Sequence, residues 1–244
     1  MIESRTLLTL LAACATAVSL IGGQSALAGD GAGPDGTQPA ANPQLEMLAT
    51  GRDLMRIGEP RRAIDEYFDK VIRYFEQAYK DSARAVYSSQ NLKMSLLYSA
   101  IPRPDKKGSE VLDSTWGDAY LLKAYALLQL GERQQARDAL CAALVVSPMS
   151  ARYMSELANT YAAEKDYDKS IELYRRSADF ANRSSSDVMR NEDLARAWRG
   201  EAYALTEQGK TQEARALYEN CLKLNPDDRN ALNELKYLDR IEKR

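Results

Sequence analysis

The sequence predicts an all-α fold, a solenoid of stacked helix-turn-helix units, and three observations lead to it. A ten-residue phrase with a small sixth residue and a final Tyr or Leu recurs at residues 58–67, 131–140, 165–174 and 209–218. The second and third copies begin 34 residues apart, at residues 131 and 165, which is a spacing typical of helical-hairpin repeats. Apolar residues follow the helical period around each copy, and the hydrophobic and charged fractions of 45% and 28% are ordinary for a globular protein.

The copy at residues 117–150 indicates how one unit is built. Its first helix is expected to end at Gly131, where the chain enters the left-handed region, and its second helix stops before Pro148. The two helices carry the apolar positions Tyr120, Ala124, Leu127 and Leu128, then Ala136, Leu140, Ala143 and Leu144. Ala136 allows close helix contact, whereas Leu140 is large enough to fill the gap toward the neighbouring unit. The counterparts of Leu140 are Tyr67, Tyr174 and Tyr218.

This pattern resembles the tetratricopeptide repeat family, and the chain is identified as an exported bacterial member. The resemblance implies a right-handed superhelical solenoid with three repeats in residues 117–228 and a degenerate N-terminal repeat in residues 44–79, whose second helix runs on to about Tyr79. The three repeats span residues 117–150, 151–184 and 195–228. The third copy departs from the family pattern, with Lys165 at the glycine position and Asn182 at the proline position. Ten extra residues, 185–194, precede the last repeat, where Ser186 or Asp187 is expected to cap a lengthened helix.

Two segments lie outside the repeats. Residues 80–116 are an irregular or helical connecting region, in which one or two short helices are expected around Val86, Tyr87, Met94, Leu97, Tyr98 and Ile101. This region either packs against the first repeat or forms a partner surface. Residues 229–244 alternate Leu232, Leu235, Tyr237, Leu238 and Ile241 with charges, which predicts a C-terminal capping helix.

The N-terminal segment is typical of an export signal. Residues 1–28 combine Arg5, an apolar run and the small residues Ala26 and Ala28, a pattern that favours cleavage before Gly29. The stretch ending at Cys14 also resembles a bacterial lipobox, which would make Cys14 an acylated mature terminus; an uncleaved anchor is the third alternative. Residues 29–43, rich in Gly and Pro, are interpreted as a flexible linker.

Composition excludes several kinds of chemistry. The chain contains no histidine, so Ser-His-Asp and Cys-His nucleophiles and imidazole-bound metals are excluded. With 33 basic and 35 acidic residues, it carries no global charge signal for nucleic acid. Cys141 and Cys221 lie two repeats apart, too far for a mutual disulfide. We therefore expect no enzyme activity, no cofactor and no metal.

The resemblance implies that the first helix of each repeat lines a concave binding surface. The inward-facing positions would be Asp118, Leu121, Tyr125, Gln129, Arg152, Ser155, Asn159, Ala163, Arg196, Arg199, Tyr203 and Glu207, with Arg52 and Arg56 in the first copy. Arginine forks and an asparagine amide suit a peptide backbone or carboxylate. The predicted partner-binding groove consists of Tyr125, Arg152, Asn159, Arg196, Arg199 and Tyr203. The alternative is that these side chains form intramolecular ion pairs on a solvated face.

The functional hypothesis is an interaction scaffold in the cell envelope, periplasmic or secreted, that holds a partner protein or peptide in its concave groove. It binds no nucleic acid and has no membrane span after signal cleavage. The alternative is an assembly subunit of an envelope complex that uses its end surfaces and residues 80–116, and a lipid anchor at Cys14 is one form of this alternative.

Overall fold

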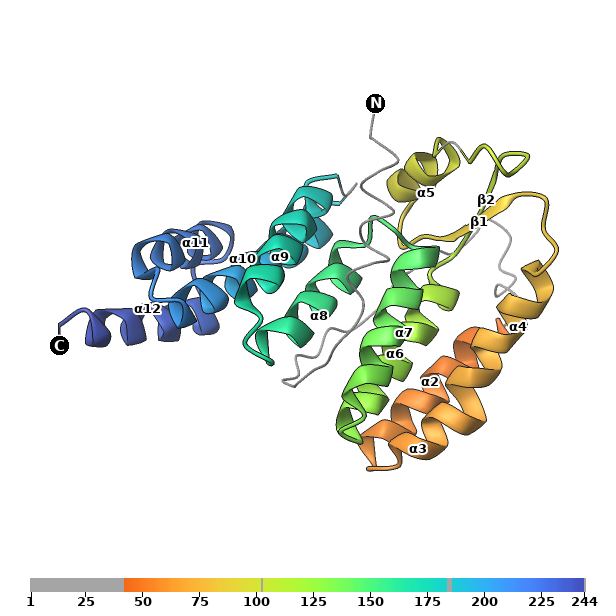
Figure 1. Ribbon diagram of the computed structural model, residues 1–244, viewed down its shortest axis with the longest axis horizontal. Helices are drawn as coiled ribbons and strands as arrows, with labels where there is room; N and C mark the ends of the chain where they lie inside the picture. The colour runs from red at the N-terminus through yellow and green to blue at the C-terminus, as the bar shows by residue number, and fades with distance from the viewer. Residues whose placement is uncertain (1–41, 102, 184–185, 244) are drawn as a thin grey trace, which may run out of the picture.

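A computed structural model describes residues 42–101, 103–183 and 186–243, and in this part the fold is an all-α solenoid. Helices follow one another in chain order along the long axis, and successive helices pack as antiparallel hairpins (Figure 1). The predicted signal peptide, Cys14 and nearly all of the predicted linker lie outside the described residues. None of the described helices combines the length and the apolar character that a bilayer span requires.

The segment predicted to be a degenerate first repeat consists of α2 (Pro43–Arg56), α3 (Pro60–Ala63), the π-helical turn η1 (Ile64–Phe68) and α4 (Asp69–Tyr79). Its second helix ends at Tyr79, as the sequence predicts. The Asn42 side chain caps α2 by accepting from the backbone N–H groups of Gln44 and Leu45.

The π-helical turn corrects one sequence expectation. A π-turn adds a residue to the helix, so the side chain that faces the core moves one position along the chain. Phe68 is therefore fully buried, whereas Tyr67, the expected counterpart of Leu140, is only half-buried. The Phe68 ring lies where a Cβ on Gly51 would be, so α2 and η1 make a close contact that requires glycine.

The remaining repeats are helical hairpins. They comprise α6 (Thr115–Gln129) with α7 (Arg133–Val146), α8 (Ala151–Ala162) with α9 (Tyr167–Ala181), and α10 (Asp187–Glu207) with α11 (Thr211–Leu224). Helix α12 (Arg229–Ile241) follows and buries Ala231 and Leu238, which confirms the predicted terminal helix. Ser186 caps the 21-residue α10 by accepting from the Met189 N–H, as expected for a lengthened helix.

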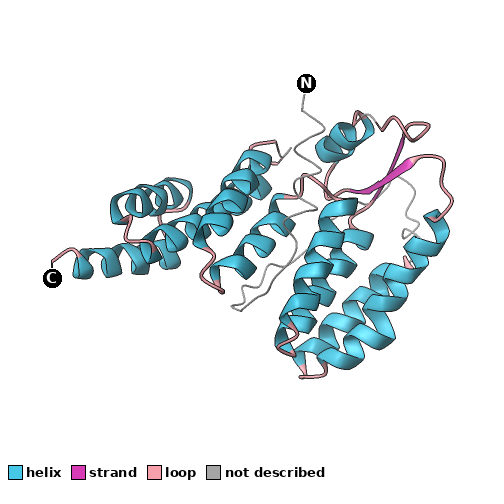
Figure 2. Cartoon of the chain, in the orientation of Figure 1, coloured by secondary structure: helices cyan, strands magenta, loops and turns pink. Residues whose placement is uncertain are grey.

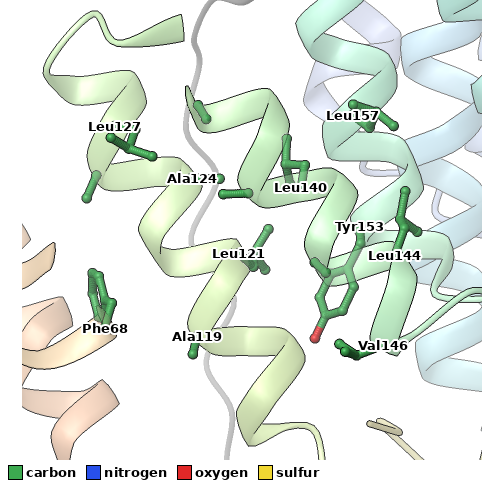
Figure 3. Close-up of a cluster of buried hydrophobic side chains, with 14 of the residues drawn as sticks. Phe68, Ala119, Leu121, Ala124, Leu127, Leu140, Leu144, Val146, Tyr153 and Leu157 are labelled. Atoms are coloured by element: carbon green, nitrogen blue, oxygen red, sulfur yellow. The ribbon is translucent and has the colours of Figure 1, made fainter. Parts of the chain in front are cut away.

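A continuous core joins the first repeat to the third (Figure 3). Ala136, Leu140, Ala143 and Leu144 are all buried, as their helical spacing predicts. A second cluster, centred on α10, α11 and α12 with Ile171 of α9, includes Ala214, Tyr218 and Cys221. Cys221 is a free, buried thiol, so it does not pair with Cys141.

The turns between paired helices need a left-handed residue. Gly58, Gly131 and Gly209 have φ of 82°, 75° and 77°, and Lys165 adopts φ of 65° at the equivalent place. At Gly131 the turn closes with the N–H groups of Gly131 and Glu132 donating to the carbonyls of Leu128 and Leu127, a Schellman arrangement.

We expect Lys165→Gly to stabilise the protein. The left-handed region costs an ordinary residue about 1–2 kcal/mol, and the greater freedom of glycine in the unfolded chain returns part of that. The free energy of unfolding should rise by about 0.5–1 kcal/mol, measured by urea denaturation. As the matched control, Gly131→Ala should lower it by about 1 kcal/mol. A destabilised Lys165→Gly variant would contradict the argument.

Residues 85–112 depart from the sequence expectation, because they contain strands as well as a helix (Figure 2). β1 (Ala85–Ser88) and β2 (Ser109–Leu112) form a parallel pair in which Ala85 is opposite Ser109, and α5 (Leu92–Ser99) connects them. Val86 and Tyr87 are thus in a strand, whereas Met94, Leu97 and Tyr98 are in the expected short helix.

This insert, residues 85–112, is attached to the turn between α7 and α8. The Ser147 hydroxyl donates to the Ser88 carbonyl at 2.6 Å, and the Met149 N–H donates to the Tyr98 hydroxyl at 3.1 Å. The Ser88 hydroxyl accepts from the Gly117 N–H at 3.2 Å. The insert is therefore bonded both to the start of the second repeat and to its end.

Candidate partner-binding face

The predicted site residues come from three successive first helices. Tyr125 lies on α6; Arg152 and Asn159 lie on α8; and Arg196, Arg199 and Tyr203 lie on α10. Residues separated by three, four or seven positions share one side of a helix, so each helix directs its members the same way. We call the surface of α6, α8 and α10 that carries these residues the first-helix face.

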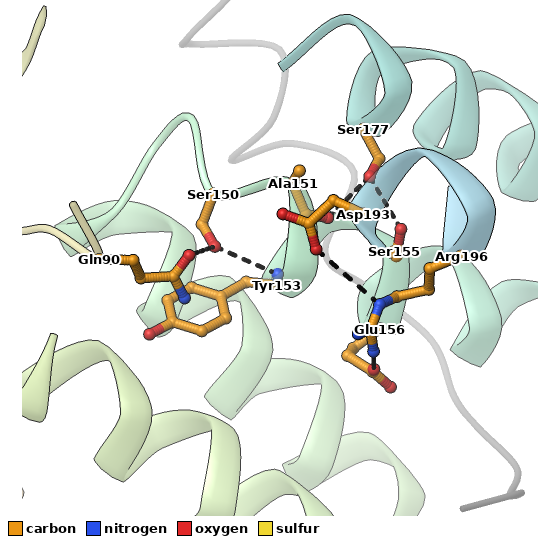
Figure 4. Close-up of polar contacts among 9 residues, drawn as sticks. All are labelled: Gln90, Ser150, Ala151, Tyr153, Ser155, Glu156, Ser177, Asp193 and Arg196. Carbon is orange, nitrogen blue, oxygen red and sulfur yellow. Dashed lines mark hydrogen bonds and ion pairs between the residues drawn. The ribbon is translucent and has the colours of Figure 1, made fainter. Parts of the chain in front are cut away.

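Arg196 connects α8 with α10. Its Nη1 donates to Glu156 Oε1 at 3.2 Å, and its Nε lies 4.0 Å from the Asp193 carboxylate (Figure 4). The side chains of Arg196, Glu156 and Asp193 are 28%, 17% and 16% exposed, so most of this network is shielded from water. Arg196 is thereby held in place by its own chain.

Arg199 is also paired within the chain. It donates to the carboxylate of Asp228, a buried side chain that also caps the N-terminus of α12. Two of the three arginines in the predicted groove therefore form intramolecular ion pairs, as the alternative interpretation of the sequence expects for them.

Tyr125 and Arg152 complete the network on the α6 side. Burial raises the pKa of the Tyr125 phenol well above its ordinary range, and the nearby Glu156 carboxylate raises it further. Burial lowers the pKa of Arg152, but Tyr125, Asp118 and Glu156 outweigh that effect and raise it overall. Among the described side chains, Arg152 Nε is buried without a hydrogen-bond acceptor.

Asn159 and Tyr203 remain available to a partner. Tyr203 is 44% exposed, and the Asn159 side chain is half-buried without a hydrogen-bond partner in the described part of the chain. The structure thus brings Tyr125, Arg152 and Arg196 together around Glu156 and leaves two uncharged polar side chains on the same face.

Two expected inward-facing residues are not at the surface. Leu121 is buried in the core, and Ser155 is buried where its hydroxyl lies 2.8 Å from the Ser177 hydroxyl. Ser177 in turn donates to the Ala151 carbonyl at 2.7 Å (Figure 4). Small hydrogen-bonded side chains here allow α8 and α9 to pack closely.

Sequence reasoning missed Glu156 and Asp193. Both lie at helical spacings from predicted residues, because Glu156 follows Arg152 by four positions and Asp193 precedes Arg196 by three. Charge pairs at these spacings interact on helices, so the signal was present in the sequence.

Beside Asp193, the insert meets α8 and α10. A cavity of about 20 Å³ lies there, lined by Gln90, Tyr98, Ser150 and Asp193 among others, and it has room for about one water molecule. In the part of the chain that the structure describes, no cluster of three or more Cys, Asp or Glu side chains is placed to hold a metal ion.

Comparison with known proteins identifies the repeats. Residues 121–186 and residues 195–228 each match a tetratricopeptide repeat model. These two stretches are therefore tetratricopeptide repeats, and the first of them contains the two phrases that begin 34 residues apart, at residues 131 and 165. The described helices and these matches together establish the solenoid fold.

Individual proteins with similar sequences or structures are distant. An alignment over 185 positions, which covers 70% of this chain, is 28% identical to the human protein O-mannosyl-transferase TMTC1, and it spans only 20% of that protein's length. The first TPR of Spaghetti (RPAP3), solved with an HSP90 peptide, is 20% identical with a TM-score of 0.46, over 55% of this chain and 98% of that one. A MamA structure is 20% identical with a TM-score of 0.47, over 76% of this chain and 80% of that one.

Proposed function

We propose that this protein is a non-catalytic interaction module that holds a segment of a partner protein against its first-helix face. One observation carries the proposal: the Glu156 carboxylate of α8 interacts both with Tyr125 of α6 and with Arg196 of α10. Three repeats therefore contribute to one continuous polar surface, long enough for an extended segment.

The chemistry of the face suits a polypeptide. The Asn159 amide has both a donor and an acceptor to offer a peptide backbone, and the Tyr203 ring provides apolar area with a polar tip. Arg196 and Arg199 are already paired, so the face has no spare cation cluster for a terminal carboxylate. We infer that an internal segment with mixed polar and aromatic side chains fits best.

Site-specific photocrosslinking tests this proposal. Benzoylphenylalanine at position 159 or 203 should capture the same partner in the native cell, and mass spectrometry would identify it. The matched control is position 172 on α9, the second helix of its repeat, where the Glu172 side chain is 67% exposed. Benzoylphenylalanine there should not capture the partner that positions 159 and 203 capture. Tyr203→Ala should weaken partner binding about tenfold without changing the thermal unfolding midpoint.

Position 92 in the insert distinguishes the alternative. Leu92 is 75% exposed. If benzoylphenylalanine at position 92 captures a partner and the same group at positions 159 and 203 does not, the proposal that the first-helix face binds the partner is contradicted and an assembly subunit is favoured.

We also propose that the protein is exported to the cell envelope, which the sequence of residues 1–28 supports. The mass of the mature protein tests this, because cleavage before Gly29 and acylation at Cys14 give different termini. An intact N-terminus in protein from the native cell would contradict both forms of cleavage.

A further inference from the structure

The C-terminal helix α12 carries a row of cations on the side opposite its buried face. The side chains of Arg229, Lys236, Arg240 and, two residues beyond the helix end, Lys243 are all exposed. Their spacings of seven, four and three residues keep them within one helical stripe. The residues of α12 that face the core, Ala231 and Leu238, are on the other side. We call these four cations the α12 stripe.

The stripe cations have no carboxylate partner among the described residues, although carboxylates lie nearby. Elsewhere in the described chain, arginines on most helices form ion pairs. The acidic residues near the C-terminal end of α12, Asp239 and Glu242, both accept from Arg215 of α11. No ion pair to any of the four stripe cations occurs among the described residues.

An aromatic side chain borders the stripe. Tyr237 is 42% exposed, and the Arg240 guanidinium lies 6.0 Å from the centre of its ring. Tyrosine is enriched where an apolar phase meets water, because its ring is apolar and its hydroxyl is polar.

We propose that the α12 stripe binds the anionic headgroups of a phospholipid membrane. Three of the four cations lie on α12, and Lys243 follows two residues past its end. Because the opposite face of α12 fixes the helix to the protein, the cations can meet a flat surface together. Mobile lipid headgroups can gather around such a fixed row, whereas a protein partner is normally held by buried apolar anchors that this side of α12 lacks.

The binding is electrostatic and peripheral. Helices that insert into a membrane surface bury an apolar face there, but the apolar face of α12 is buried against α10 and α11. Each exposed cation near an anionic membrane contributes about a fivefold gain in affinity, and salt screens it. Glu234 of α12 helps to raise the pKa of Tyr203 and therefore lies toward the first-helix face, away from the stripe. Binding of the stripe to a membrane would thus leave the first-helix face free for a partner.

Vesicle sedimentation of the full chain tests the proposal. Wild-type protein should bind vesicles with about 30% phosphatidylglycerol at least tenfold more tightly than pure phosphatidylcholine vesicles, with the difference lost in about 0.5 M salt. A variant with Lys236, Arg240 and Lys243 replaced by glutamine should lose roughly tenfold or more in affinity for the anionic vesicles only. Every variant contains the same apolar N-terminal run. Its contribution to vesicle binding is therefore the same for each variant and cancels when affinities are compared as ratios.

The matched control replaces three exposed lysines elsewhere, Lys70, Lys80 and Lys210, by glutamine. It changes the net charge equally and should bind anionic vesicles as wild type does. Circular dichroism verifies that both variants stay folded, and Lys236→Gln alone should give an intermediate loss. Equal losses in the two triple variants, or no loss in the stripe variant, would overturn the proposal. So would stripe-dependent binding to polyglutamate or single-stranded DNA that is tighter than binding to the vesicles.

Discussion

Replacing Gly200 by alanine should destabilise the protein by about 2–3 kcal/mol, although the same change in an open helix stabilises by about 1 kcal/mol. Gly200 lies within α10, and a Cβ there would come closer to the Tyr174 ring of α9 than the 3.0 Å below which real Cβ atoms do not approach. Tyr174 is only 5% exposed, so its ring has little room to move aside. Urea denaturation measures the change.

The Tyr174→Ala background is the control for this effect. Once the ring is gone, Gly200→Ala should raise the free energy of unfolding by up to about 1 kcal/mol, because only helix propensity remains. A double-mutant cycle therefore gives a change of sign. Additive effects of the two substitutions would show that α9 and α10 do not meet at Gly200.

Asp193→Asn should stabilise the protein at neutral pH. Burial raises the pKa of Asp193 from 3.8 to about 6, despite the attraction of Arg196 and Arg152. A shift of about two pKa units corresponds to about 3 kcal/mol, which is an upper limit for the gain on removing the charge. The free energy of unfolding of the variant, compared with wild type near pH 7.5, measures it.

The stability gain of the Asp193→Asn variant should depend on pH. Because the folded-state pKa of Asp193 lies above its unfolded value, the folded state takes up the proton first, and the cost of the buried charge is relieved as pH falls from about 6 to about 4. The advantage of the Asp193→Asn variant over wild type should therefore vanish below about pH 4. Asp187→Asn on the same helix, where the side chain is 82% exposed, should show no such gain. A destabilised Asp193→Asn variant at pH 7.5 would mean that the ion pair with Arg196 outweighs burial.

Much of the fold could be predicted from local rules. The recurring glycine marks a backbone position with positive φ, so the helix ends at Gly131 and Gly209 follow from the sequence alone. Lys165 fills the same position, which shows that the repeat period is informative even where the preferred residue is absent. The terminal helix was predictable because its apolar residues follow the helical period.

Other features depend on contacts that a single sequence does not display. The strand at Val86 and Tyr87 exists because residues 109–112 pair with it, more than twenty positions later, and short apolar runs fit helix and strand equally well. The π-turn likewise places Phe68 against Gly51, a contact between residues 17 positions apart that the sequence does not display. In the candidate site, the positions of the arginines were predictable but their partners were not, because the pairing of Arg199 with Asp228 depends on how α12 packs.

The insert also bears on how the protein unfolds. In an array of repeats, each unit gains stability mainly from its immediate neighbours, so the ends fray independently. The hydrogen bond from Ser147 to Ser88 joins residues 59 positions apart and links the N-terminal half across repeat boundaries. Among the described contacts, no hydrogen bond links α11 or α12 to the first three repeats, and their apolar cluster reaches those repeats only through Tyr167 and Ile171 of α9. Cooperative unfolding is therefore expected to be greatest in the N-terminal half, with local opening concentrated at the C-terminal end.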